Sequence, residues 1–226
     1  MPSGSPTDCT QCTLAGACVL SDVLRARPGA GALATQKPFF KPGQTLRQEG
    51  EMAGSLDVVK TGLVMLGQEG LDGQDKPLAL VGRGHVLGVS ALSGKTGVFW
   101  ARAQSEVTLC RLPLAELGIR QAEADRHALV PELYTKSLAA LTAWTQVIRL
   151  PRLKQRVHSA LALLVEAQGS TRIHLPRQAD LAQLLLVTRE SLGRALGELE
   201  SEGVLKRVDR HRADVLCLPV LPEKTG

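Results

Sequence analysis

The sequence contains no run of about 18 apolar residues, the length that a membrane-spanning helix requires. Its first residues, MPSGSPTDCT, contain neither the basic patch nor the apolar stretch of an export signal. These two absences predict a cytoplasmic protein with no membrane partner. The 226 residues are 44% hydrophobic and carry a formal net charge of +5, so they can bury the core of one large or two modest domains.

Motifs of catalysis are absent as well. The sequence has no glycine-rich cofactor loop and no spacing typical of a catalytic triad. It also has no second cysteine motif of the kind that many iron-sulfur electron carriers use. We therefore expect that the chain is not an enzyme. An iron-sulfur electron-transfer protein is an alternative that no further motif supports.

Three of the five cysteines lie in one short stretch, DCTQCTLAGACVL, residues 8–20. The cytoplasm keeps thiols reduced, and an odd number of cysteines is a poor basis for a disulfide framework. Cys9, Cys12 and Cys18 have the spacing C-x2-C-x5-C, which favours metal ligation over incidental cysteines in a loose tail. Zinc and iron-sulfur clusters both fit this spacing, and both need a fourth ligand from elsewhere. The candidates are Cys110, Cys217, His85, His127, His158, His174 and His211, of which Cys217 is expected to be a small buried side chain instead.

Residues 37–113 consist of short apolar runs separated by glycines, such as LDVVKTGLVML and PLALVGRGHVLGV. Short strands with a turn about every eight to twelve residues predict a small antiparallel sandwich or barrel. Glycine adopts positive φ at low cost, so glycines are expected at the corners. The expected corners are Gly43, Gly50, Gly62, Gly67, Gly73, Gly82 and Gly88. Residues 1–36 form a separate cysteine-bearing segment rich in Gly, Ala and Pro.

Residues 114–150 are predicted to be helical, and HALVPELYTKSLAALTAWTQVIRLP contains the long helix. An apolar stripe at helical spacing runs along one side and stops at Pro151. Its members are Val130, Tyr134, Leu138, Leu141 and Ile148, and a second apolar face consists of Leu133, Trp144 and Val147. One face can pack on the sheet and the other on a second subunit, so the stripe is a candidate dimer interface. Packing of the stripe on the chain's own sheet is the alternative.

Residues 151–219 predict helices followed by a hairpin, and residues 220–226 form a tail. RLKQRVHSALALLVEAQG is a helix that ends at Gly169, and PRQADLAQLLLVTRESLGRALGELESEG contains two helices with a short break at Leu186. The stretch VLKRVDRHRADVLCL then predicts two strands joined around Arg210 and His211. This order of elements is the outline of a winged helix-turn-helix.

Basic residues concentrate in this part of the chain. From Val147 onward there are 13 Lys and Arg against 9 Asp and Glu, so a difference of +4 accounts for most of the net charge of +5. Such an excess of positive charge suits phosphate binding, although charge alone would favour the interpretation that these residues form a charged helical bundle exposed to solvent. The helix that begins TRESLGRAL favours DNA, because arginine binds guanine bidentately and glutamate accepts from the cytosine amino group. The candidate DNA contacts are Arg177, Thr188, Arg189, Glu190, Ser191, Gly193, Arg194, Lys206 and Arg210.

Across nearly its whole length the chain resembles the CRP/FNR family of transcription regulators. The glycine-cornered strands with KPGQTL at their entry, the long helix and the winged helix-turn-helix with R-E-S-L-G-R carry this resemblance. C-x2-C-x5-C together with Cys110 in VTLCRLP resembles the FNR branch, in which four such cysteines hold an oxygen-labile [4Fe-4S] cluster.

The resemblance implies an α+β fold with a cupin-like antiparallel β-roll (a double-stranded β-helix) as sensor domain. It implies that Cys9, Cys12, Cys18 and Cys110 are the cluster ligands. It further implies a homodimer on an inverted-repeat DNA site, with RNA polymerase as partner and with dimerisation under the control of the cluster. A zinc-stabilised regulator or a thiol switch without a cluster is the alternative.

Three departures from the family patterns affect these expectations. Val89 follows Gly88 where the cyclic-nucleotide branch has glutamate, and the downstream stretch is TGVFWARA, so no cyclic nucleotide is expected. Leu186 lies at the helix-turn-helix corner where relatives often have glycine, which predicts mild strain. Arg189 and Gly193 resemble the CRP branch, so TGTGA-like half-sites are expected rather than the TTGAT-like half-sites of the FNR branch.

Overall fold

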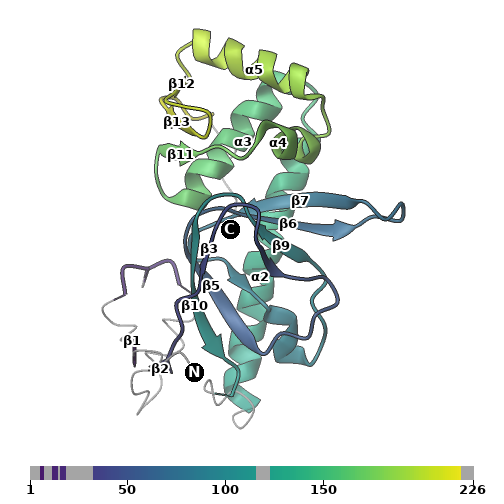
Figure 1. Ribbon diagram of the computed structural model, residues 1–226, viewed down its shortest axis with the longest axis vertical. Coiled ribbons are helices and arrows are strands. Elements are labelled where there is room, and N and C mark those ends of the chain that lie inside the picture. Colours follow the sequence, from purple (N-terminus) through teal and green to yellow (C-terminus); the bar gives the residue numbers. More distant parts are fainter. Residues whose placement is uncertain (1–5, 8–11, 15, 19–32, 116–122, 220–226) are drawn as a thin grey trace.

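The computed structural model describes residues 6–7, 12–14, 16–18, 33–115 and 123–219 (Figure 1). Two antiparallel four-stranded sheets form the first part of the fold, with strand orders β3-β10-β5-β8 and β4-β9-β6-β7. The strands are β3 (Phe39–Phe40), β4 (Thr45–Arg47), β5 (Ser55–Thr61), β6 (Val64–Glu69), β7 (Asp75–Val81), β8 (Val86–Leu87), β9 (Trp100–Ala103) and β10 (Val107–Pro113). The expected antiparallel β-roll is thus confirmed. Two short strands, β1 (Pro6–Thr7) and β2 (Leu33–Ala34), pair separately.

The β-roll encloses a core to which both sheets contribute. Val59 and Leu109 come from one sheet, and Val64, Val81 and Ala101 come from the other. Gly62 turns the chain with φ of +93°, and a Cβ there would lie 2.2 Å from the carbonyl oxygen of Glu106.

Two of the glycines expected at corners serve another purpose. Gly67 lies within β6, where a Cβ would lie 2.0 Å from the Trp100 ring, so close packing and not a turn requires glycine. Gly82 also lacks positive φ and instead lets two backbones approach each other.

The long helix α2 (Glu123–Ile148) lies along the β-roll and leads toward the winged helix (Figure 1). Leu133 and Trp144 are buried, and Nε1 of Trp144 donates a hydrogen bond of 2.9 Å to the carbonyl oxygen of Leu80. Tyr134 and Leu138, on the predicted stripe, are 42% and 62% exposed. The second apolar face is therefore the one that packs on the β-roll. None of the helices in the described ranges combines the length and apolar character that crossing a membrane requires.

The last part of the fold is a winged helix-turn-helix. It consists of α3 (Leu153–Gln168), β11 (Arg172–His174), α4 (Gln178–Leu184), α5 (Arg189–Ser201), β12 (Leu205–Arg207) and β13 (Arg212–Val215), and its three strands form a sheet in the order β11-β13-β12. Gly169 and Gly203, at the predicted helix ends, both have positive φ. The third strand, β11, which lies between α3 and α4, was not predicted.

One hydrophobic core joins this winged helix to the rest of the molecule. The same cluster contains Leu80 of β7, Trp144 of α2, Leu161 of α3 and Leu192 of α5. Two hydrogen bonds cross the same boundary: Gln183 donates to the carbonyl oxygen of Asp75 at 2.8 Å, and Nε2 of His174 lies 3.0 Å from that of Gln104. The orientation of α5 relative to the β-roll is therefore fixed by this packing.

Candidate nucleic-acid interface and cysteine site

The recognition helix α5 starts at a side-chain cap. Oγ1 of Thr188 accepts a hydrogen bond of 3.2 Å from the backbone N–H of Ser191, as its position before the helix predicted. Leu192, Ala195, Leu196 and Leu199 are buried on one face, so the opposite face is presented to solvent. Glu190 and Arg194 lie on that face and Arg189 lies beside them at the start of the helix, and all three are exposed. The structure thus brings the central residues of the predicted DNA reader together on one accessible surface.

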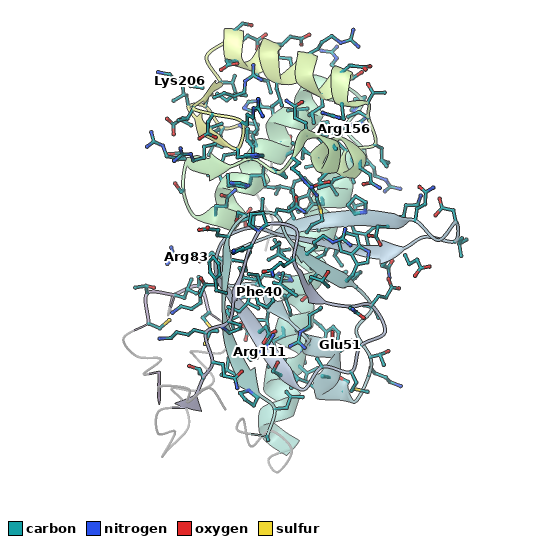
Figure 2. The ribbon with its side chains drawn as sticks, in the orientation of Figure 1. Phe40, Glu51, Arg83, Arg111, Arg156 and Lys206 are labelled. Atoms are coloured by element: carbon teal, nitrogen blue, oxygen red, sulfur yellow. The ribbon has the colours of Figure 1, made fainter. Side chains whose placement is uncertain are left out.

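The turn before α5 has a strained backbone. Leu186 has φ of +56°, the one non-glycine residue with positive φ in the described ranges. Arg156 supports this turn, because it donates to the carbonyl oxygens of Leu185 at 2.9 Å and Leu150 at 3.0 Å (Figure 2). The predicted strain at Leu186 is thus confirmed, and its side chain is 73% exposed.

Ion pairs divide the basic residues of the winged helix into two groups. The first group is neutralised within the domain and consists of the pairs Arg172–Asp214 (2.7 Å), Arg177–Asp180 (2.9 Å), Arg207–Glu200 (2.7 Å), Arg212–Asp209 (2.7 Å) and Lys154–Glu202. Within the part of the chain that the structure describes, Arg189, Arg194, Lys206 and Arg210 form no ion pair. This second group therefore supplies the charge that an outside anion can meet.

Three carboxylates of the first group, Glu200, Asp209 and Asp214, are held in their charged form. The pKa of Glu200 is lowered chiefly by the hydrogen bond from the Arg207 side chain. The pKa of Asp214 is lowered chiefly by the hydrogen bond from Arg172. The pKa of Asp209 is lowered first by the backbone N–H of His211 and then by Arg212. These pairs stay ionised at neutral pH and brace the hairpin β12–β13, the wing.

A hollow of about 780 Å³ separates the wing from the helices. It lies between the start of α4, the start of α5 and the tip of the wing, and Arg177, Arg189, Arg207 and Arg210 line it. Lys206 lies on the wing at the α5 end of the molecule (Figure 2). The predicted contacts Arg177, Arg189 and Arg210 thus line one hollow, whereas Lys206 is exposed on β12 outside that lining, and Arg177 is partly neutralised by Asp180.

Gly193 differs from the glycines that the fold requires. A Cβ at this position would meet no atom of the chain within 4 Å. Nothing within the described structure therefore explains glycine here, which leaves close approach of DNA as the prediction for this residue.

The candidate metal ligands are only partly brought together. Cys18 and Cys110 both pack, half-buried, against one hydrophobic cluster that also includes Leu114 and Val130. Cys12 is half-buried in the same segment as Cys18, and Cys9 lies outside the described residues. Within the described ranges, no three His, Cys, Asp or Glu side chains are arranged to hold a metal ion. Thiols suit iron-sulfur clusters and zinc equally, so the donor chemistry fits both groups.

Cys217 differs from expectation. It is exposed just beyond the last strand, where its carbonyl oxygen lies 3.0 Å from Nε2 of His158. The prediction of a buried side chain was wrong because β13 ends at Val215, before the cysteine.

A cavity of about 290 Å³ lies between the β-roll and α2. Gly88, Val89, Val98 and Phe99 line it together with Tyr134, Leu138 and Leu141 of α2, so most of its wall is apolar. Arg47 also lines it, but its guanidinium already binds Asp57 at 2.7 Å and Glu51 at 3.0 Å. Arg47 was not among the predicted site residues. The sequence feature that could have indicated this buried ion pair is Asp57, a charged residue within the apolar run LDVVK.

Comparison with known proteins finds one matching family model for the β-roll and one for the winged helix-turn-helix. Residues 37–118 match the family model of the cyclic nucleotide-binding domain, and residues 155–221 match that of the Crp-like helix-turn-helix domain. The cyclic AMP receptor protein of Thermus thermophilus is 28% identical over 174 residues, which cover 76% of this chain and 80% of that protein.

Solved structures share the fold. FixK2 from Bradyrhizobium japonicum superposes with a TM-score of 0.70 at 19% identity, over 82% of this chain and 94% of that one. A CRP-family transcriptional regulator from Thermus thermophilus gives 0.63 at 22% identity, over 80% and 92%.

Proposed function

Because the chain belongs to the CRP/FNR-type DNA-binding transcription regulators, we propose that it responds to oxygen through a [4Fe-4S] cluster on Cys9, Cys12, Cys18 and Cys110. The observation that carries the proposal is the shared position of Cys18 and Cys110. They are far apart in the sequence, yet both pack against the hydrophobic side chains that include Leu133 and Val130 of α2. Gain or loss of a group bound to these thiols would therefore take place next to α2, the helix that carries the exposed stripe.

When bound, the cluster supplies iron–thiolate bonds that tie the N-terminal segment to β10 and that oxygen can break. Through the packing of the chain's own residues, these bonds would keep α2 ordered. Leu112 and Leu114 at the end of β10, with Val130 and Leu133, pack between the thiols and the helix. Loss of the tie would loosen this packing and so weaken the dimer.

Homodimerisation is proposed to use Tyr134, Leu138, Leu141 and Ile148 of α2. The first two are exposed and apolar or amphipathic, and they border the cavity between α2 and the β-roll. Two recognition helices are needed because the half-sites of an inverted repeat lie about one DNA turn, or roughly 34 Å, apart. A monomer would keep half of the DNA contacts.

DNA reading is proposed to depend on the cations without ion pairs. Arg189 would bind an additional guanine of a TGTGA-like half-site, and Glu190 and Arg194 would read the shared G·C pair. Lys206 and Arg210 on the wing would bind phosphates. RNA polymerase is the expected further partner at the promoter.

A cyclic nucleotide is not proposed as the effector, despite the family model that the domain matches. A phosphate needs several free donors, whereas the Nη1 and Nη2 groups of Arg47 already bind Glu51, Asp57 and Ser55, and only its Nε is left without a partner. Ser90 and Gln48 add few polar groups to the remaining apolar wall. Addition of cyclic AMP or cyclic GMP should leave the affinity for DNA unchanged.

Anaerobic purification followed by absorption spectroscopy and iron and sulfide analysis tests the cofactor. The expected result is a brown protein with about four iron and four sulfide per chain, whose visible absorption bleaches in air. Cys110→Ser should lose the cluster, and Cys217→Ser is the matched control that keeps it. A colourless protein with one zinc per chain, or one without metal, would replace the cluster with the zinc or the thiol-switch mechanism.

A further inference from the structure

The turn between β7 and β8, Gly82–Arg83–Gly84, lies between the cysteine segment and the DNA-binding domain. We call it the corner. Figure 2 shows Arg83 at the boundary between the β-roll and the winged helix, on the side of the N-terminal segment. The corner donates a backbone hydrogen bond to the DNA-binding domain and a side-chain hydrogen bond to the cysteine segment.

Toward the DNA-binding domain, the corner meets the end of α3. The backbone N–H of Arg83 donates a hydrogen bond of 2.7 Å to the carbonyl oxygen of Ala167, in the last turn of that helix. A Cβ on Gly82 would lie 2.2 Å from the same oxygen, so only glycine permits this approach. The last carbonyls of a helix lack partners within it, so the β-roll caps α3 at this point.

The Arg83 side chain adds to this contact. Its Cδ and Nη1 atoms both lie 3.6 Å from the position of a Cβ on Gly169, the residue that ends α3. A guanidinium at this place is favoured by the partial negative charge of the helix carboxyl end.

Toward the cysteine segment, the same side chain makes the other contact. Nη2 of Arg83 donates a hydrogen bond of 2.6 Å to the carbonyl oxygen of Thr13. Gly84 has φ of +83°, and a Cβ there would lie 2.6 Å from the carbonyl oxygen of Ala17. Thr13 follows Cys12 and Ala17 precedes Cys18, so both contacts lie directly beside candidate ligands.

The corner is also tied to the sheet. The N–H of Gly84 donates to the carbonyl oxygen of Val59 at 2.9 Å, and the N–H of Val59 donates to that of His85 at 2.9 Å. Packed elements held this way tend to shift between discrete arrangements rather than deform smoothly. A shift of the segment that pulls on Arg83 is therefore passed to α3.

We propose that Arg83 is a positioning residue that couples the state of the cysteine segment directly to the DNA-binding domain, in parallel with the dimer helix. The inference rests on the proposed role of the cysteines as the regulated site, but not on which metal they hold. Arg83 binds the segment with its side chain and α3 with its backbone. Loss of the guanidinium removes the first link and leaves the second in place.

Coupling between two binding events is reciprocal, so DNA should also affect the cysteine segment. The test measures the alkylation rates of Cys12 and Cys18 by peptide mass analysis in metal-free, reduced full-length protein, without DNA and with a selected duplex at a concentration high enough to saturate the weaker binding of the metal-free form. In the unmodified protein, DNA should change these rates about three- to tenfold, the range expected from the net contribution of one ordinary hydrogen bond. In Arg83→Ala the change should fall to about one.

Two further variants sharpen the result. Arg83→Lys keeps a cation and a donor and should keep most of the effect, and Lys95→Ala, another exposed cation of the β-roll, should keep all of it. An undiminished DNA effect in Arg83→Ala, or no effect in the unmodified protein, would overturn the coupling. Iron and sulfide content, measured separately, decides the cofactor, so the two proposals fail independently.

Discussion

Arg111 donates two hydrogen bonds of 2.8 Å, from Nε and Nη2, to the two carboxylate oxygens of Asp57, which is fully buried. Arg47 approaches the same carboxylate from β4 at 2.7 Å. The hydrogen bonding to the Asp57 carboxylate is the main reason that the pKa of Arg111 is raised. One buried anion thus joins β5, β10 and the wall of the cavity next to α2.

Asp57→Asn should therefore be strongly destabilising. The change leaves two part-buried guanidiniums without their anion, which should lower the free energy of unfolding by about 3 kcal/mol. Urea unfolding measures this difference. Asp75→Asn is the matched control, because its pair with Arg102 is solvent-exposed and worth about 1 kcal/mol or less. Equal losses for the two variants would contradict a special role for the buried pair.

His85 should make the fold sensitive to acid. Burial lowers the pKa of His85 to about 4 from 6.5, so the imidazole is neutral in the native state. Its contribution is fully present above pH 6.5 and is lost as the pH falls from 6.5 toward 4, because only the unfolded state is protonated there. Stability at pH 5 should be lower than at pH 7.5 by up to about 2 kcal/mol.

Urea unfolding of His85→Gln at both pH values checks this origin. The variant cannot take up the proton, so part of the difference between pH 5 and pH 7.5 should disappear. An identical pH dependence in the variant and the unmodified protein would assign the acid sensitivity to other groups.

Leu138→Glu should separate subunits without harming the fold. Leu138 is 62% exposed in the single chain, whereas Leu141 is half-buried and packs on the core. A glutamate at position 138 would face its own copy across the dimer seam, where unpaired like charges are costly. Sedimentation should show a monomer that keeps its cluster. Leu71→Glu, at the fully exposed tip of the β6–β7 hairpin, is the control and should remain a dimer.

Arg189→Val should change which DNA is preferred. The Arg189 side chain forms no ion pair within the described residues, and loss of its bidentate guanine contact should cost about 1 to 3 kcal/mol per half-site. Binding to TGTGA repeats should weaken relative to TTGAT repeats, with little change in the salt dependence. Arg177→Ala, which removes a cation already paired with Asp180, should have a smaller effect. Selection of TTGAT repeats by the unmodified protein would show that Arg189 does not read bases.

The predictable features of this protein are those encoded by near neighbours in sequence. Thr188 caps α5, Gly169 and Gly203 have the positive φ expected at helix ends, and Leu186 is strained, because caps and turns depend on a few adjacent residues. Gly67 and Cys217 were misplaced because a packing partner and a strand end decide their surroundings.

Contacts between distant segments could not be predicted. Arg83 is one of many basic residues in the sequence, and only the fold brings Thr13 and Ala167 to it. The Asp57 network likewise needs β5 and β10 in register and β4 of the other sheet close by, although a charged residue within an apolar run marked its position.

The affinity of one anaerobic sample for an inverted-repeat duplex, measured before and after exposure to air and compared with its iron and sulfide content, tests the central claim most directly. We predict tight binding with the cluster present. The loss after air should reach several powers of ten if each half-site contributes several kcal/mol, because about 1.4 kcal/mol corresponds to tenfold in affinity. An affinity that does not change while iron and sulfide are lost would contradict an oxygen-responsive regulator.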